Sequence, residues 1–143
     1  MKNPKTNNQR EFLPTFADLV DTLSIDQIKE IKLKNKESYA QEMNKISYDI
    51  DLLIKEKDIK PSAKLIRLVI IIAQVNLFIW ENKDKMKQDP KQYDKLLKLS
   101  HQLNGIRNRM KNLLLEESGE KEPSKKRTNI ETEGLKGWES SLK

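Results

Sequence analysis

Residues suited to acid–base or metal chemistry are few in this sequence. His101 is its only histidine, and cysteine is absent, which excludes a two-histidine metal site, a thiolate metal site and a cysteine nucleophile. Metal binding would depend on carboxylates, but Asp49 and Asp51 are two residues apart and point to different faces of a helix. The paired acidic motifs of all-α nucleotide pyrophosphatases, a Gly-rich phosphate loop and a serine-hydrolase elbow are missing. We therefore expect no metal and no cofactor.

Two groups of polar residues lie beside apolar helical stripes. In the first, Asn76, Trp80 and Asp84 are successively one helical turn apart, so they share one side of a helix. The second group lies on a later helix and consists of Asn104, Arg107 and Asn108. If the two groups face each other, they form a polar cluster with a tryptophan wall.

This predicted cluster has two interpretations. Buried asparagines must be hydrogen-bonded, and such networks can fix the register of helices. Alternatively, the cluster forms a small pocket for an anionic or nucleotide-like ligand, with Arg107 on the charge and Trp80 as the stacking face. Both interpretations stay open at the level of sequence.

A third candidate surface is basic. Lys29, Lys32 and Lys36 share one helical face, and the chain of 143 residues has a formal net charge of +6. These lysines could contact the phosphates of a nucleic acid, but no aromatic residues are interleaved with them, so base recognition is not indicated. A solvated lysine face is the simpler interpretation.

These residues must be positioned by helices. The composition is 35% charged and 36% hydrophobic, rich in Lys, Glu, Leu and Ile, and favours long helices. Residues 65–80 are apolar on every helical face, which predicts a helix surrounded by others. The apolar run covers only about 15 residues, fewer than the roughly 20 that a bilayer requires, and contains Arg67, Gln74 and Asn76, so we expect no membrane span.

Caps and spacings predict the remaining helices. Thr15 is a plausible N-cap for a short helix, and Ser24 offers a second cap for the next one. A break or kink near residues 34–38 is left open, and Lys60-Pro61-Ser62 and Asp89-Pro90 mark later boundaries. Two regular stripes predict a bundle seam and the core face of the last helix: Tyr39, Met43, Ile46, Ile50 and Leu53, and then Leu96, Leu99, Leu103, Ile106, Met110 and Leu113.

The predicted fold is a single all-α bundle of about four to five helices around a buried central helix at about 63–85. Residues 1–14 are predicted to be a flexible N-terminal arm, 15–117 the bundle, and 118–143 a disordered tail. Within that tail, Leu135 and Trp138 place large apolar side chains where no core exists. They are either a solvated end or a peptide that docks on a partner or on the bundle.

Three segments together resemble a known family. They are Leu19-Val20-Asp21-Thr22-Leu23-Ser24-Ile25 with Lys29, Asn76-Leu77-Phe78-Ile79-Trp80 followed by Asp84, and Leu103-Asn104-Gly105-Ile106-Arg107-Asn108. This pattern is similar to that of an uncharacterised family of small helical proteins from bacteria and tailed phages of the T-even type. Lys83 stands where the family pattern has an acidic residue next to Asp84. This difference argues against a carboxylate pair at this position. The resemblance implies a helical bundle and a phage or bacterial origin, and it carries no activity.

The leading expectation is a non-enzymatic protein that acts through protein–protein interaction, as an accessory or regulatory factor or a small assembly component. The alternative is a nucleic-acid-associated factor that uses the basic helix face, and the third is an enzyme or ligand binder with a pocket near Asn76, Trp80 and Arg107. The absence of cysteine and of an apolar N-terminal run predicts a cytoplasmic protein, in the host cytoplasm if it is phage-encoded. We expect a protein partner and no membrane, with a homo-oligomer possible.

Overall fold

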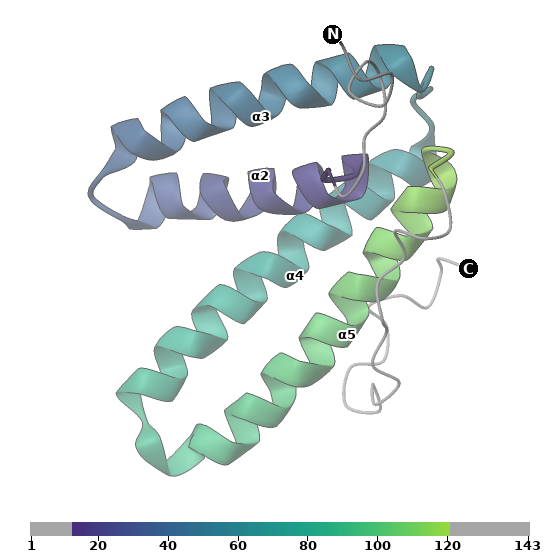
Figure 1. The fold of residues 1–143 in the computed structure, drawn as a ribbon. Coiled ribbons are helices and arrows are strands. Elements are labelled where there is room, and N and C mark those ends of the chain that lie inside the picture. Colours follow the sequence, from purple (N-terminus) through teal and green to yellow (C-terminus); the bar gives the residue numbers. More distant parts are fainter. Residues whose placement is uncertain (1–12, 121–143) are drawn as a thin grey trace, which may run out of the picture.

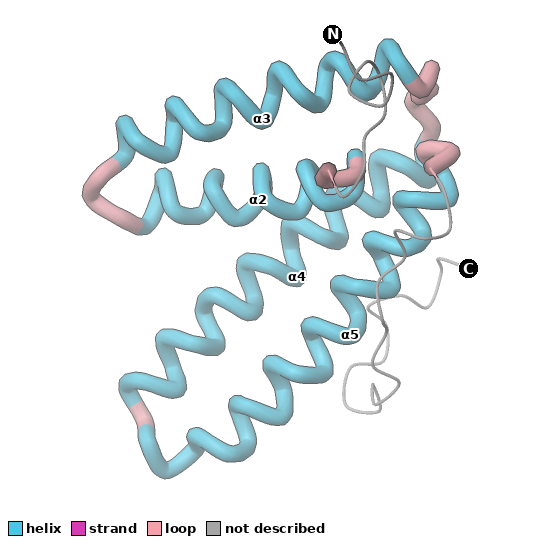
Figure 2. Tube along the Cα trace, in the orientation of Figure 1, coloured by secondary structure: helices cyan, strands magenta, loops and turns pink. Residues whose placement is uncertain are grey.

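The structure is a computed structural model that describes residues 13–120. This part of the chain contains four α-helices and one short 3-10 helix, and no strand (Figures 1 and 2). In chain order they are α2 (Phe16–Lys32), α3 (Lys36–Glu56), α4 (Ala63–Gln88), η1 (Pro90–Gln92) and α5 (Tyr93–Glu117). The expected all-α bundle is confirmed.

The helices form two hairpins, α2–α3 and α4–α5, and α2 crosses the α4–α5 hairpin (Figure 1). α2 packs against α3, α4 and α5, whereas α3 packs mainly against α2. Among the described helices, α2 thus contacts the other three, while α4, which covers residues 63–85, packs along α5 and against α2. The far half of the α4–α5 hairpin extends beyond α2 (Figure 1).

The ends of the helices follow the predicted caps except at Ser24. Thr15 Oγ1 accepts a hydrogen bond from Asp18 N at 3.1 Å, and Asp18 Oδ2 accepts one from Thr15 N at 3.2 Å, which completes a capping box. Ser62 caps α4 through Leu65 N at 3.0 Å. Ser24 starts no new helix, because its hydroxyl donates to the carbonyl of Asp21 at 2.8 Å and α2 continues to Lys32.

The core lies between the first half of α2 and the facing sides of α4 and α5. The α5 stripe supplies Leu103, Ile106 and Met110, each at most 1% exposed, as its spacing predicts. The fully buried residues of α4 are Leu68, Ile72 and Val75, and the core residues around the start of α2 include Phe16 and Ala17. The stripe predicted on α3 is covered only in part, with Ile46 and Leu53 buried, because α3 has a single main neighbour.

α4 is buried on one side only, which corrects the expectation of a fully enclosed helix. Ile66, Ile70 and Leu77 are 51%, 48% and 39% exposed. The helix has 26 residues and is, by length and composition alone, long enough to cross a membrane, with 33% of its most apolar 18-residue window buried. Apolar residues on every face thus did not imply neighbours on every face.

The folded part extends past the predicted boundary at residue 117. Ser118 is buried, and its hydroxyl donates to the carbonyl of Leu115 at 3.0 Å. Glu120 Oε1 accepts a hydrogen bond from Phe16 N at 2.7 Å, so the end of α5 is joined to the start of α2. The predicted arm and tail otherwise lie outside the described residues, and so does the docking peptide predicted at Leu135 and Trp138.

Candidate functional site

Asn76 joins three helices through its side-chain amide. Its Nδ2 atom donates to Asp21 Oδ1 and to Ser24 Oγ on α2, each at 2.7 Å. Its Oδ1 atom accepts from Arg107 Nη1 on α5 at 3.1 Å. Asn76 is 4% exposed, so these hydrogen bonds replace the ones that water would make.

Lys111 lies one helical turn beyond Arg107 and extends the same cluster. Its Nζ atom is 3.0 Å from Asp21 Oδ2 and 3.1 Å from Asp18 Oδ1. Asp21 and Lys111 are both buried. We call Asp18, Asp21, Ser24, Asn76, Arg107 and Lys111 the buried network. Its two carboxylates, one ammonium and one guanidinium balance in charge, so the network needs no ion from outside to neutralise it.

One atom of the buried network has no partner among the described residues. The Nε atom of Arg107 is buried and makes no hydrogen bond. A buried donor that makes no hydrogen bond is energetically costly. Within the buried network, the Nε atom of Arg107 is therefore the position at which a further acceptor could bind.

The six residues of the predicted cluster are brought together only in part. Asn76 and Arg107 are hydrogen-bonded, as the facing-stripe hypothesis requires. Trp80 is half-buried and Asp84 is exposed, each further along α4. On α5, Asn104 and Asn108 are half-buried beside Arg107.

The residues that complete the network on α2 were not predicted. Asp18, Asp21 and Ser24 lie at spacings of three on one face of α2, a signal that an assumed helix start at Ser24 interrupted. Lys111 follows Arg107 at i+4, so its position on the same stripe could be predicted from the sequence. The sequence did not show which stripes would meet across the bundle.

A second buried asparagine fixes the α4–α5 hairpin. Asn82 is 3% exposed, and its Nδ2 atom donates to the carbonyl of Leu96 at 2.7 Å and to Ser100 Oγ at 2.8 Å. These two bonds hold the register of the hairpin on the side away from α2.

The three lysines proposed for nucleic-acid contact lie around the turn between α2 and α3. Lys32 and Lys36 are exposed. Lys29 is half-buried, with its Nζ atom 5.7 Å from the centre of the Tyr39 ring, a cation–π distance. Contact of this surface with nucleic acid stays a prediction.

Asp26 and Glu42 form an acidic pair between α2 and α3. Asp26 is 2% exposed, and its Oδ2 atom has no hydrogen-bond partner in the described part of the chain. The pKa of Asp26 is raised from the ordinary 3.8 to about 6, first by burial and then by the hydrogen bond and the charge of Glu42, while the charge of Lys29 acts in the opposite direction. The folded state therefore holds this proton more tightly than the unfolded chain does.

We predict that Asp26→Asn stabilises the protein at pH 7 but not at pH 4. Because the pKa is raised on folding, the wild type loses stability as pH rises from about 4 through about 6, on the order of 3 kcal/mol in total. The amide carries no charge and can still donate to Glu42. Urea unfolding of both proteins at the two pH values measures the difference, and an equal difference at pH 4 and pH 7 would be inconsistent with a raised pKa.

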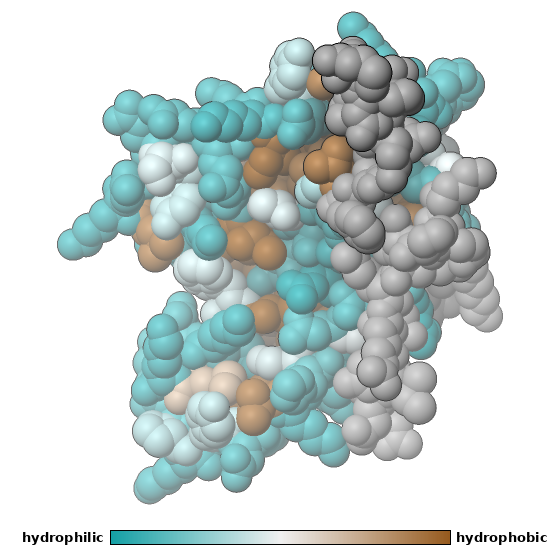
Figure 3. Space-filling view, viewed as in Figure 1, coloured by the Kyte–Doolittle hydropathy of each residue, from teal (hydrophilic) through white to brown (hydrophobic). Residues whose placement is uncertain are grey.

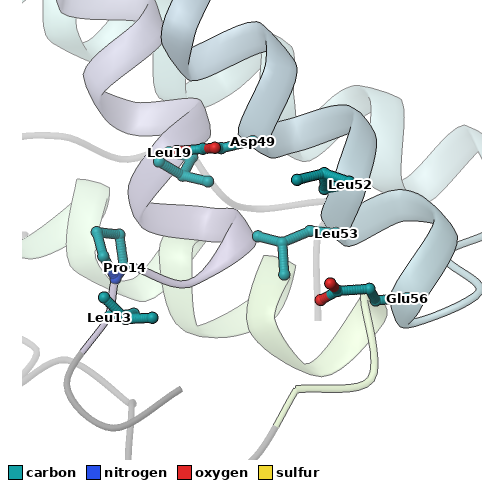
Figure 4. A pocket seen from close by; sticks show the side chains of 7 residues that line it. All are labelled: Leu13, Pro14, Leu19, Asp49, Leu52, Leu53 and Glu56. Atoms are coloured by element: carbon teal, nitrogen blue, oxygen red, sulfur yellow. The ribbon is translucent and has the colours of Figure 1, made fainter. Parts of the chain in front are cut away.

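A shallow pocket of about 210 Å³ lies between the start of α2 and the last turns of α3, away from the buried network (Figure 4). Its walls are mainly apolar, with the carboxylates of Asp49 and Glu56 among the lining side chains (Figure 4). The remaining lining residues are Leu13, Pro14, Leu19, Leu52 and Leu53. This mixture offers no charged group that would complement an anionic ligand.

A line of exposed and half-buried apolar residues runs along α4. Ile66, Ile70, Ala73 and Leu77 are spaced four, three and four residues apart and therefore lie on one side of the helix. We call these four residues the α4 face. On the side of the molecule in Figure 3, apolar side chains gather between α2 and α3, and smaller apolar patches interrupt the polar surface over the α4–α5 hairpin.

Comparisons with protein-family models, curated proteins and solved structures find no match to this chain. The resemblance to a family of small phage and bacterial helical proteins therefore stays a prediction that depends on its three short segments. Within residues 13–120, no three histidine, aspartate or glutamate side chains are grouped so that they could hold a metal ion.

Proposed function

We propose that this protein is a non-enzymatic interaction protein, either an accessory or regulatory factor or a small component of a larger assembly, and that it binds a protein through the α4 face. The observation that carries the proposal is the exposure of Ile66, Ile70 and Leu77 on one line of a helix. Single exposed apolar residues are common on proteins, but a continuous line of them is typical of an interaction surface.

The chemistry around the α4 face favours a protein partner over a lipid one. Arg67, Gln74 and Glu81 are exposed on the same side of α4 and border the apolar line. An apolar strip bordered by polar and charged residues is the usual composition of a protein interface. Hydrocarbon would leave these polar groups unsatisfied.

The buried network supports a structural role for Asn76 and Arg107 rather than a ligand pocket. Every side-chain polar atom of Asn76 is hydrogen-bonded to Asp21, Ser24 or Arg107. A ligand at this position would have to break those bonds. Within the buried network, only the buried Nε atom of Arg107 could bind a ligand without breaking an existing hydrogen bond, as the enzyme or ligand-binding alternative would require.

The resemblance adds two elements to the proposal. It favours a phage or bacterial origin, and with it a cytoplasmic site of action, in the host cytoplasm if the protein is phage-encoded. Among the functions of small helical proteins of that kind, binding to another protein agrees best with an exposed helix face and an internally neutral network.

We predict that Leu77→Lys and Ile70→Lys abolish capture of the binding partner while leaving the fold intact. Both side chains are 39% or more exposed, so a lysine there can reach water, but its charge would be desolvated at an interface. The measurement is affinity capture with the tagged full chain from cells that produce it, quantified by mass spectrometry, with circular dichroism to verify helicity.

Tyr48→Lys is the matched control, because Tyr48 is 65% exposed and lies on α3. It should leave capture unchanged. Equal capture by all three variants and the wild type would refute the assignment of the interaction to the α4 face.

A further inference from the structure

We infer that the α4 face binds a second copy of this chain, with the two α4 helices antiparallel. This inference depends on the proposed function, since it names the partner for the same surface. It comes from the order of charges along α4 as well as from the apolar line. Arg67 flanks the beginning of the α4 face, while Glu81, Lys83, Asp84 and Lys85 follow its end, and all five are exposed.

Arg67 and Glu81 lie on the same side of α4 and carry opposite charges, so this pair complements itself when a second copy runs in the opposite direction. Gln74 lies midway in sequence between Arg67 and Glu81. A two-fold axis near Gln74 places each Arg67 opposite Glu81 of the partner subunit, and both contacts form together because the interface is isologous. A parallel pair would instead place like charges side by side.

The apolar residues agree with the same axis. Ile70 and Leu77 lie at nearly equal sequence distances on either side of it, so Ile70 faces Leu77 of the partner subunit. Ala73 lies next to the axis, where a small side chain lets two helices approach closely. Larger residues toward the ends and a small one in the middle give an antiparallel helix pair a close fit.

The length of the α4 face determines the expected strength. From Ile66 to Leu77 the helix rises about 16 Å, so one face buries less than the roughly 800 Å² per subunit of a standard interface. We therefore expect a reversible dimer with a dissociation constant in the micromolar range. Dilution should separate the subunits without unfolding them.

Sedimentation velocity of the full chain, over about a hundredfold range of concentration up to roughly 1 mM, tests this inference. The weight-average mass should rise from 16.8 kDa toward twice that value, and Leu77→Lys should remain at the monomer mass. Arg67→Glu and Glu81→Arg should each weaken the dimer about tenfold, because each change affects both symmetric contacts. The double variant should restore it, which non-specific apolar association would not do.

A wild type that stays monomeric throughout this range would overturn the second-copy inference. Dimerisation that persists unchanged in Leu77→Lys would also overturn it. The same holds if the protein stays monomeric and co-sediments with phospholipid vesicles, and Leu77→Lys abolishes that co-sedimentation. Partner capture that is lost in Leu77→Lys while the wild type is monomeric would leave the proposed function standing and remove only this inference. Loss of neither self-association nor capture in that variant would remove both.

Discussion

Lys111→Met should lower the free energy of unfolding by about 3–5 kcal/mol. The change leaves Asp21 Oδ2 and Asp18 Oδ1 without the ammonium group that lies 3.0 and 3.1 Å away. Asp21 is 8% exposed, so water replaces the lost partner poorly. A loss of this size is a large fraction of the roughly 5–15 kcal/mol of a typical domain. Urea unfolding followed by circular dichroism at pH 7 measures it.

Lys95→Met is the matched control, because Lys95 is exposed on the same helix, and its effect should stay within about 0.5 kcal/mol. Adding Asp21→Asn to Lys111→Met should recover part of the loss, since it removes one of the two stranded charges. If Lys111→Met and Lys95→Met were equally stable, the ion pairs between α2 and α5 would contribute nothing to the fold.

Asn76→Ala should cost about 2–4 kcal/mol. Its side chain is the link between α2, α4 and α5, and its removal leaves Asp21 Oδ1, Ser24 Oγ and Arg107 Nη1 each short of one hydrogen bond. The same residue separates the two interpretations of the polar cluster. A structural residue changes stability when it is removed, whereas a ligand-binding residue changes ligand affinity.

The measurement is the unfolding free energy of Asn76→Ala beside that of Gln74→Ala, an exposed position two residues earlier on α4. We expect Gln74→Ala to be neutral. The ligand-binding alternative would be favoured instead if Asn76→Ala were as stable as the wild type but lost a rise in melting temperature that a nucleotide or metabolite causes in the wild type.

The parts of the fold that depend on one helix at a time were predictable. The leucine stripe of α5 predicted which side of this helix is buried, because an apolar period near 3.6 specifies one face whichever element packs against it. Thr15 and Ser62 gave two helix starts, since a cap is a local hydrogen bond. The break near residues 34–38, left open by the sequence, became the turn between α2 and α3.

The parts that depend on which helices meet were not predictable. Ser24 resembles an N-cap, yet its hydroxyl can equally donate to a carbonyl within a helix, and packing of α2 on α4 and α5 favours the continuous helix. Residues 65–80 of α4 are apolar on every helical face, so hydrophobicity alone did not show which side lacks a neighbour; the spacing of Arg67, Gln74 and Glu81 by seven residues was the sign of that side. For the candidate site, the Asn76–Arg107 contact was foreseen, whereas its connection to Asp18 and Asp21 required the crossing of the hairpins.

The central claim, that the α4 face binds protein, is tested most directly by crosslinking from within it. A photoreactive benzophenone amino acid in place of Leu77, in the full chain produced in its own cells, should form covalent adducts with a protein, while the same group in place of Tyr48 on α3 should form few. Peptide mapping identifies the adduct as a second copy or as another protein. Equal yields at the two positions, or no protein adduct from position 77, would contradict the claim.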